Sequence, residues 1–93
     1  MSALRELVRK ASTVLVDVRN EWEYDSGHIP GAMNIPLDQV AARIEEFKSI
    51  QNPVVVYCRS GGRSGMAVSI LKQHGIDEVY NGGGLTDMHL LLN

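Results

Sequence analysis

The sequence has little cysteine and little net charge, and each shortage excludes a class of protein. With one cysteine in 93 residues, it cannot form an internal disulfide or a thiolate zinc cluster. The three histidines, His28, His74 and His89, show no metal-ligand spacing. A lone thiol is easiest to reconcile with a reducing cytoplasm. We therefore predict a cytoplasmic protein without a metal or another cofactor.

Long apolar runs are also missing. No stretch approaches the roughly 20 apolar residues that span a bilayer, and the net charge of −2 gives no sign of a nucleic-acid or membrane partner. The first ten residues place charged and apolar side chains at helical spacing, which predicts an amphipathic helix rather than a signal peptide. With no repeat and no linker, the sequence predicts one domain over residues 1–93.

Strand-like and helix-like segments alternate along the chain. Nearly continuous apolar runs predict buried strands at residues 13–18 and 54–57, and further short strands are predicted at residues 33–35 and 77–80. Helical spacing and capping residues predict further helices at residues 20–25, 38–48, 63–74 and 85–92. This alternation is typical of an α/β fold with a small, mostly parallel sheet, flanked by helices on both faces, that binds ligands beyond the carboxyl ends of its strands.

Several boundaries are predicted in more detail. Asn20 and Asp38 are the expected helix N-caps, and Gly75 is expected to end the helix over residues 63–74. In that helix we expect an inward face made of Met66, Ala67, Ile70 and Leu71. Residues 81–84, an asparagine and three glycines, are predicted to form a loop.

The lone cysteine, Cys58, follows the apolar residues 54–57 and opens the segment Cys-Arg-Ser-Gly-Gly-Arg-Ser. Glycines let backbone N–H groups turn inward, and the helix that follows adds the positive end of its dipole, so this loop favours a thiolate. A thiol with a pKa near 8.5 is about 3% ionised at pH 7, and lowering that pKa by about two units costs about 2.7 kcal/mol. A cysteine that only packs is the alternative, but it explains neither the glycines nor the arginines. We predict Cys58 as a nucleophile.

Two groups of residues together resemble the rhodanese family. The first is Asp17-Val18-Arg19 with Glu23-Tyr24 and residues 27–36, and the second is residues 58–64 with the glycines and leucine at 82–85. The resemblance covers nearly the whole chain. It is strongest to the small single-domain thiosulfate sulfurtransferases of the phage-shock type, which share the Gly-Gly-Leu-x-Asp ending found here at residues 83–87.

The resemblance implies a rhodanese-like domain and a specific reaction. The Cys58 thiolate takes the outer sulfur of thiosulfate, sulfite leaves, and the cysteine persulfide passes its sulfur to cyanide or to a thiol acceptor. Arg63 is the first choice for binding the anionic donor, while Arg59 either binds substrate or points to solvent. The amide cradle for the transferred sulfur is expected from the residues after the cysteine: Arg59, Ser60, Gly61, Gly62, Arg63 and Ser64.

Other residues of the motifs are expected to support the site. Arg19 and Glu23 lie four residues apart, the spacing of an ion pair, and the resemblance implies that this pair braces the loop after the first strand. Asp17 either accepts hydrogen bonds from the cysteine loop or serves as a local cap. His28 is predicted to be a hydrogen-bonded turn residue rather than a general base.

The chain departs from the family at Met88, where a tryptophan is common, so the packing of the last helix is open. Trp22 either lines the pocket or lies on the surface.

Two other functions are weighed: a persulfide carrier charged by a partner desulfurase, and a phosphatase. Phosphatases of related fold place five residues between cysteine and arginine, whereas four separate Cys58 from Arg63, so we expect a loop too tight for phosphate. A vestigial binding module is the last alternative, and it does not explain the retained cysteine and arginines.

Overall fold

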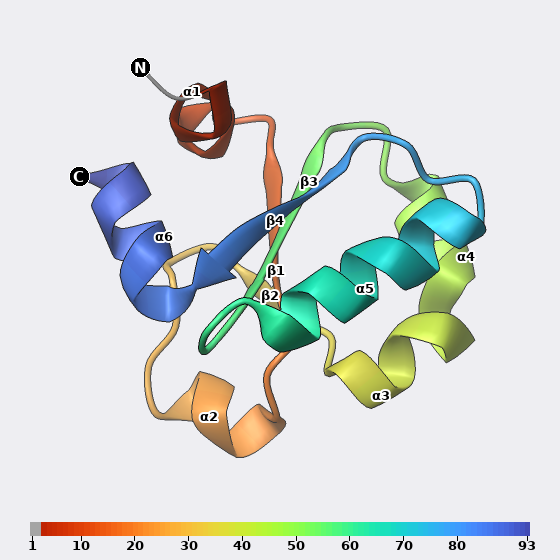
Figure 1. Ribbon diagram of the computed structural model, residues 1–93, viewed down its shortest axis with the longest axis horizontal. Coiled ribbons are helices and arrows are strands. Elements are labelled where there is room, and N and C mark those ends of the chain that lie inside the picture. Colours follow the sequence, from red (N-terminus) through yellow and green to blue (C-terminus); the bar gives the residue numbers. More distant parts are fainter. Residues whose placement is uncertain (1–2) are drawn as a thin grey trace.

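The computed structural model describes residues 3–93 and contains a four-stranded sheet in which every neighbouring pair is parallel. The strands lie in the order β2, β1, β3, β4. Their bounds are Val14–Asp17 for β1, Met33–Asn34 for β2, Val54–Cys58 for β3 and Val79–Gly84 for β4. The predicted α/β fold with a parallel sheet is confirmed, and β3 occupies an inner position (Figure 1).

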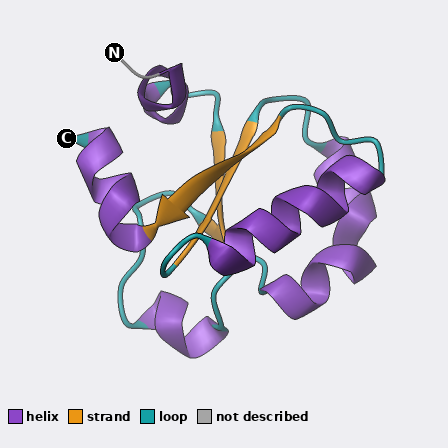
Figure 2. Cartoon of the chain, viewed as in Figure 1, coloured by secondary structure: helices purple, strands orange, loops and turns teal. Residues whose placement is uncertain are grey.

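Helices cover both faces of this sheet. They are α1 (Ala3–Arg9), α2 (Glu21–Asp25), α3 (Leu37–Val40), α4 (Ile44–Ser49), α5 (Gly62–Gln73) and α6 (Leu85–Leu92). Figure 2 shows α1 and α6 together on one side, and α3, α4 and α5 on the other. The opening helix is confirmed over residues 3–9, and the rest of its predicted start, Met1 and Ser2, lies outside the described residues.

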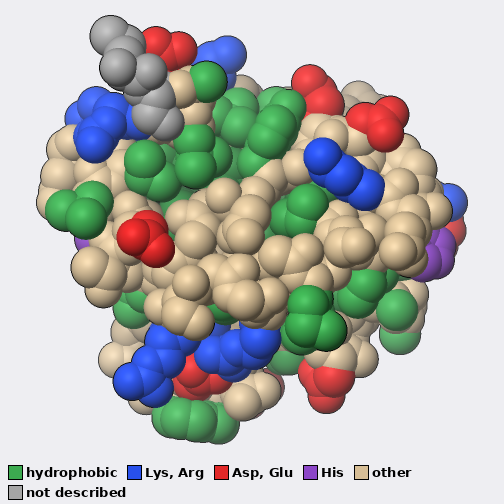
Figure 3. All heavy atoms as spheres, in the orientation of Figure 1, with side chains coloured by type: hydrophobic (Ala, Val, Ile, Leu, Met, Phe, Trp, Pro, Cys, Tyr) green, Lys and Arg blue, Asp and Glu red, His purple; other side chains and the backbone are tan. Residues whose placement is uncertain are grey.

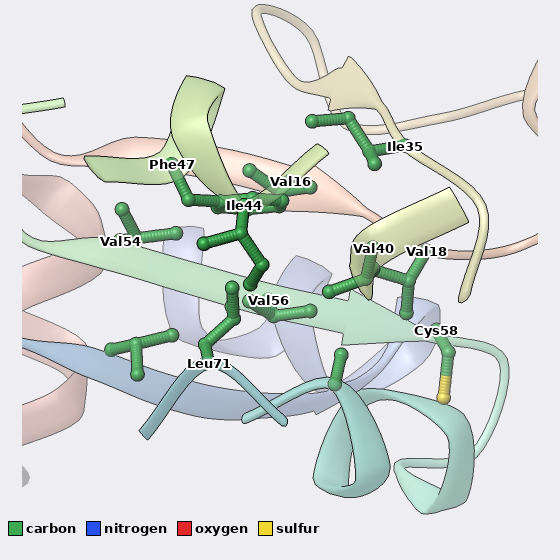
Figure 4. Close-up of a cluster of buried hydrophobic side chains, with 12 residues drawn as sticks. Val16, Val18, Ile35, Val40, Ile44, Phe47, Val54, Val56, Cys58 and Leu71 are labelled. Carbon is green, nitrogen blue, oxygen red and sulfur yellow. The ribbon is translucent and has the colours of Figure 1, made fainter. Parts of the chain in front are cut away.

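The alternation of side chains along β3 fills both halves of the core. Val54, Val56 and Cys58 belong to a cluster with α3, α4 and α5, while Val55 and Tyr57 pack on the side of α1 and α6. Successive side chains of a strand point to opposite faces, and both faces here are covered by helices, so every residue of β3 is buried. Figure 4 shows Cys58 at the end of this row, where the strand leaves the core.

Two helix predictions are wrong in detail. The helix expected over residues 38–48 begins at Leu37, with Pro36 rather than Asp38 at the N-cap, and a 3₁₀ turn at Ala41–Arg43 separates α3 from α4. Proline fits this position because it lacks an N–H that would be left without a helical partner.

Met66, expected inward, is 60% exposed, because the buried stripe of α5 runs through Ser64, Ala67 and Leu71. Gly75 takes a positive φ of 85° just after α5, as expected of a helix stop.

The glycine-rich segment 81–84 is strand rather than loop. β4 continues through it, with a register shift between Val56 and Tyr57 that leaves Gly82 as the extra residue of a bulge. A Cβ on Gly82 would lie 2.8 Å from Cγ1 of Val55, so the absence of a side chain permits close packing against β3. The same continuation brings Gly84 beside Cys58 in the ladder. β4 therefore reaches the cysteine loop.

Candidate active site

Cys58 ends β3 and is 1% exposed. Its sulfur points away from the aliphatic cluster, toward the turn before α5 (Figure 4). The Gly61 N–H donates to this sulfur over 3.0 Å and the Ser64 N–H over 3.4 Å, and the Ser64 hydroxyl oxygen lies 3.4 Å away. The first turn of α5 thus directs donors at the sulfur, as the sequence predicts.

The backbone of the loop requires a glycine at one of its two central positions but not at the other. Gly61 precedes α5 with a φ of 101°, in the left-handed region that favours glycine. Gly62 is the first residue of α5, and a Cβ there would meet no atom within 4 Å. The fold therefore requires a glycine at position 61 but not at position 62, and the part of Gly62 in the cradle stays a prediction.

The surroundings of Cys58 hold its thiol pKa below the ordinary value. Burial raises the pKa because it penalises the charged sulfur, but hydrogen bonds from the Ser64 hydroxyl and from the N–H groups of Ser64, Ser60 and Gly61 lower it by more. A thiolate is the nucleophilic form of cysteine. The loop therefore favours a reactive sulfur.

Arg63 forms a bidentate ion pair with Glu23, which α2 contributes from the other side of the loop. Its two terminal nitrogens lie 2.7 Å and 3.1 Å from the two carboxylate oxygens. The hydrogen bond from Arg63 is the main cause that lowers the pKa of Glu23 to about 2, against the opposing effect of burial. The predicted pairing of Glu23 with Arg19 is wrong, because the helix turns Glu23 toward α5.

Arg19 pairs instead with Asp17, and both side chains are buried. Its side chain and its own N–H donate to the Asp17 carboxylate over 2.8–3.0 Å, and a terminal nitrogen donates to the Gly27 carbonyl over 2.7 Å. The Asp17 carboxylate thus braces the segment after β1. This segment carries α2 and Glu23, so Asp17 supports the site indirectly. His28, as predicted, lies in the turn, with Nδ1 2.8 Å from the Tyr24 carbonyl.

A surface pocket of about 320 Å³ lies beside the loop. Its lining includes Arg19, Trp22, Glu23, Arg59 and Leu85. Trp22 is 68% exposed, so it both lies on the surface and lines the pocket. Figure 3 shows basic side chains gathered over α2 and the turn before α5, with acidic atoms between them. Arg59 and Arg63 have different roles here, since Arg59 has an exposed side chain and Arg63 is engaged by Glu23.

One residue of the site is missed by sequence reasoning. Asn81 of β4 places Oδ1 2.7 Å from the Ser64 hydroxyl oxygen, and its Nδ2 donates to the Gly61 carbonyl over 3.1 Å. The sequence offers only the position of Asn81 before three glycines, a pattern that predicts a loop. Met88 of α6, where the chain departs from the family pattern, is fully buried in the cluster that also contains Val55 and Tyr57 of β3.

These features define an α/β domain in which a buried cysteine sulfur is presented by a turn between an inner strand and a helix. The chain belongs to the rhodanese-like domain family, whose family model matches residues 1–88. The prediction of a sulfurtransferase domain is thereby confirmed at the level of the family.

Individual relatives agree with this assignment. The thiosulfate sulfurtransferase PspE of Escherichia coli is 43% identical over 74 residues, covering 78% of this chain and 71% of PspE. The uncharacterized protein YqhL of Bacillus subtilis is 45% identical over 73 residues, and the match covers 78% of this chain but only 56% of YqhL. A solved structure described as a rhodanese with anions from E. coli superposes with a TM-score of 0.73 at 41% identity, covering 81% of this chain and 89% of that one.

Proposed function

We propose that the protein is a thiosulfate sulfurtransferase that works through a Cys58 persulfide. The Cys58 thiolate attacks the outer sulfur of thiosulfate, the sulfur–sulfur bond breaks, and sulfite leaves with the electron pair. Cyanide or a thiolate acceptor then attacks the terminal sulfur, which releases the Cys58 thiolate with thiocyanate or a new persulfide. The observation that carries the proposal is the set of donors from Gly61 and Ser64 on a sulfur of lowered pKa.

The donor-binding role is best suited to Arg59. Arg63, the first choice from the sequence, has its guanidinium engaged by Glu23, so its charge is largely offset. Arg59 lines the adjacent pocket, has an exposed side chain, and offers a cation to a sulfonate group. In this proposal Arg63 and Glu23 fix the position of α2 against the loop, and the N–H groups of the loop hold the transferred sulfur.

The proposal applies to one domain over residues 1–93, and the free thiol suits a reducing compartment such as the cytoplasm. None of the helices within residues 3–93 has the length and hydropathy that crossing a bilayer requires. The relative PspE, named a thiosulfate sulfurtransferase, supports the choice of donor.

The direct test is intact-mass analysis after treatment with thiosulfate. The wild-type protein should gain the mass of one sulfur atom, and cyanide should remove it with formation of thiocyanate. Cys58→Ser, in which one atom is changed, should gain nothing. A wild-type protein that stays unmodified, or a Cys58→Ser variant that gains the same mass, would contradict the proposal.

Steady-state kinetics separates this function from the two alternatives. A sulfurtransferase turns over with thiosulfate and cyanide alone, whereas a carrier requires its partner desulfurase. Hydrolysis of an aryl phosphate should be negligible, because four residues rather than five separate Cys58 from Arg63 and the guanidinium is engaged. Sustained phosphate release that disappears in Cys58→Ser would contradict the assignment.

A further inference from the structure

The Ser64 hydroxyl has one proton and four possible acceptors. Its oxygen lies 2.7 Å from Oδ1 of Asn81, 3.1 Å from the Gly61 carbonyl, 3.4 Å from the Cys58 sulfur and 3.5 Å from the Gly83 carbonyl. A hydroxyl donates one good hydrogen bond at a time, and the contact with Asn81 has the most favourable distance. The proton therefore points to Asn81 when the sulfur is uncharged.

The side-chain amide of Asn81 is fixed in one orientation. Oδ1 accepts the Gly83 N–H over 2.9 Å, and Nδ2 donates to the Gly61 carbonyl over 3.1 Å. Turning the amide around would set NH₂ against the N–H and oxygen against the carbonyl, so both bonds would be lost. Oδ1 is consequently held toward Ser64 as an acceptor.

We propose that Asn81 is a positioning residue for the nucleophile: it competes with the Cys58 sulfur for the proton of Ser64 and so sets how readily the thiolate forms. A charged sulfur attracts this proton more strongly than a neutral amide oxygen does, so the hydroxyl turns to Cys58 on ionisation. Each ionisation therefore gives up the bond between Ser64 and Asn81. The inference rests on Cys58 as the nucleophile of the proposed function.

The charged groups near the sulfur stay the same in the neutral variants of the test. Arg63 faces it from α5 with Glu23 of α2 as its partner, Asp17 lies at the end of β1, and Arg59 follows in the loop. Differences among neutral variants of Ser64 and Asn81 therefore report hydrogen bonds rather than altered charge.

The experiment measures the rate of alkylation of Cys58 by iodoacetamide as a function of pH, since the chain has no other thiol. In Asn81→Ala the Cys58 pKa should fall by about half a unit to one unit, up to the size of one neutral hydrogen bond, because Ser64 then gives up only its longer contact with the Gly61 carbonyl when it donates to the sulfur. Ser64→Ala should raise the pKa by a similar amount. Once Ser64 is alanine, adding Asn81→Ala should leave the pKa unchanged.

The sign of the shift distinguishes this role from a merely structural one. If Asn81 only anchored the loop, its loss would loosen the N–H donors and raise the Cys58 pKa. A rise in Asn81→Ala, or an equal fall with and without Ser64, would overturn the inference. Asn52→Ala, an exposed asparagine ahead of β3, is the matched control and should not move the pKa.

A second variant covers the case in which Asn81→Ala does not fold. Asn81→Asp keeps the shape and the acceptor, but its carboxylate holds the Ser64 proton more tightly and adds a negative charge, so the Cys58 pKa should rise by at least about one unit. A pKa that stays or falls in Asn81→Asp would overturn the inference. The expected shifts in a protein that transfers no sulfur would support this inference and count only against the proposed function.

Discussion

Two arginines of the same loop differ in what their charge does. The Arg63 side chain is 34% exposed and bound to a carboxylate that is itself 8% exposed, whereas Arg59 points its side chain to the surface pocket. Removing the cation that pairs with a buried carboxylate lowers the stability of the fold, whereas removing a solvated arginine changes it little. The two residues should therefore separate substrate binding from stability.

Replacing each arginine by alanine tests this separation. In Arg59→Ala the KM for thiosulfate should rise about tenfold through loss of one charged contact, with the free energy of unfolding nearly unchanged. In Arg63→Ala the free energy of unfolding should fall by about 1–3 kcal/mol, because Glu23 is left without its partner. Steady-state kinetics and urea unfolding of both variants provide the measurements. If Arg63→Ala alone raised KM and kept full stability, Arg63 would be the donor-binding residue.

Glu23 makes the stability of the protein depend on pH. Its pKa is about 2 in the folded state, against an ordinary value of 4.5, so the folded state favours the ionised form. The resulting stabilisation is complete above the ordinary pKa and is lost as the pH falls from there toward 2. The free energy of unfolding should therefore fall by roughly 1–2 kcal/mol between about pH 7 and about pH 3 because of this group, a range that allows for the solvent around Arg63.

Urea unfolding of Glu23→Gln at both pH values isolates this contribution. The variant should be less stable than the wild type near neutral pH, and the difference should shrink in acid as Glu23 of the wild type becomes protonated. Glu45→Gln is the control, since the Glu45 side chain is 88% exposed and should give a small, nearly constant difference. A Glu23→Gln difference that stays constant with pH would show that the ion pair with Arg63 does not stabilise the fold.

At the scale of elements, the site depends on how the end of β4 meets the cysteine loop. Gly84 pairs with Cys58, and a Cβ on Gly84 would overlap the Arg59 carbonyl oxygen and lie 3.1 Å from the Ser60 Cα. These neighbours are backbone atoms, which cannot move aside as a flexible side chain does. Any side chain on Gly84 must therefore displace the loop or the strand.

Gly84→Ala and Gly62→Ala form a matched pair within one site. Gly84→Ala should lower the free energy of unfolding by about 3 kcal/mol and slow sulfur transfer by about a hundredfold, since a shift of roughly 1 Å misplaces the nucleophile. Gly62→Ala should be as stable as the wild type or up to about 1 kcal/mol more stable, because its Cβ meets nothing and alanine favours the helix. Urea unfolding and kcat measure both effects. Equal stability of the two variants would show that β4 does not restrain the loop.

The sequence predicts elements better than it predicts their contacts. β1, β3 and α5 follow from apolar runs and helical spacing, which are local properties, and Cys58 follows from the segment around it. The partner of Glu23 does not, because Arg63 is 40 residues away and only the fold brings α2 against α5. Asn81 is missed for a related reason: glycines usually indicate a loop, whereas here they let β4 pass close to β3 and the cysteine turn.

At the scale of the whole molecule, one sheet joins two cores. Leu71 of α5 belongs to the cluster that contains Val54, Val56 and Cys58, and Met88 of α6 belongs to the cluster that contains Val55 and Tyr57. The residues of β3 alternate between these clusters, so neither core can open without disturbing the strand that both share. We therefore expect the two halves to unfold together.

Leu71→Ala and Met88→Ala test this coupling from opposite faces. Each side chain is fully buried, so each change should lower the free energy of unfolding by about 3 kcal/mol, out of a total of roughly 5–14 kcal/mol for a chain of this length. Met66→Ala and Leu90→Ala, on the same two helices but 60% exposed, are the controls and should each cost less than about 0.5 kcal/mol. Circular dichroism and the alkylation of Cys58, followed across a urea titration, should report one transition in every variant. If Met88→Ala split the transition, with α6 melting while Cys58 stayed protected, the two faces would be separate folding units and the shared strand would not couple them.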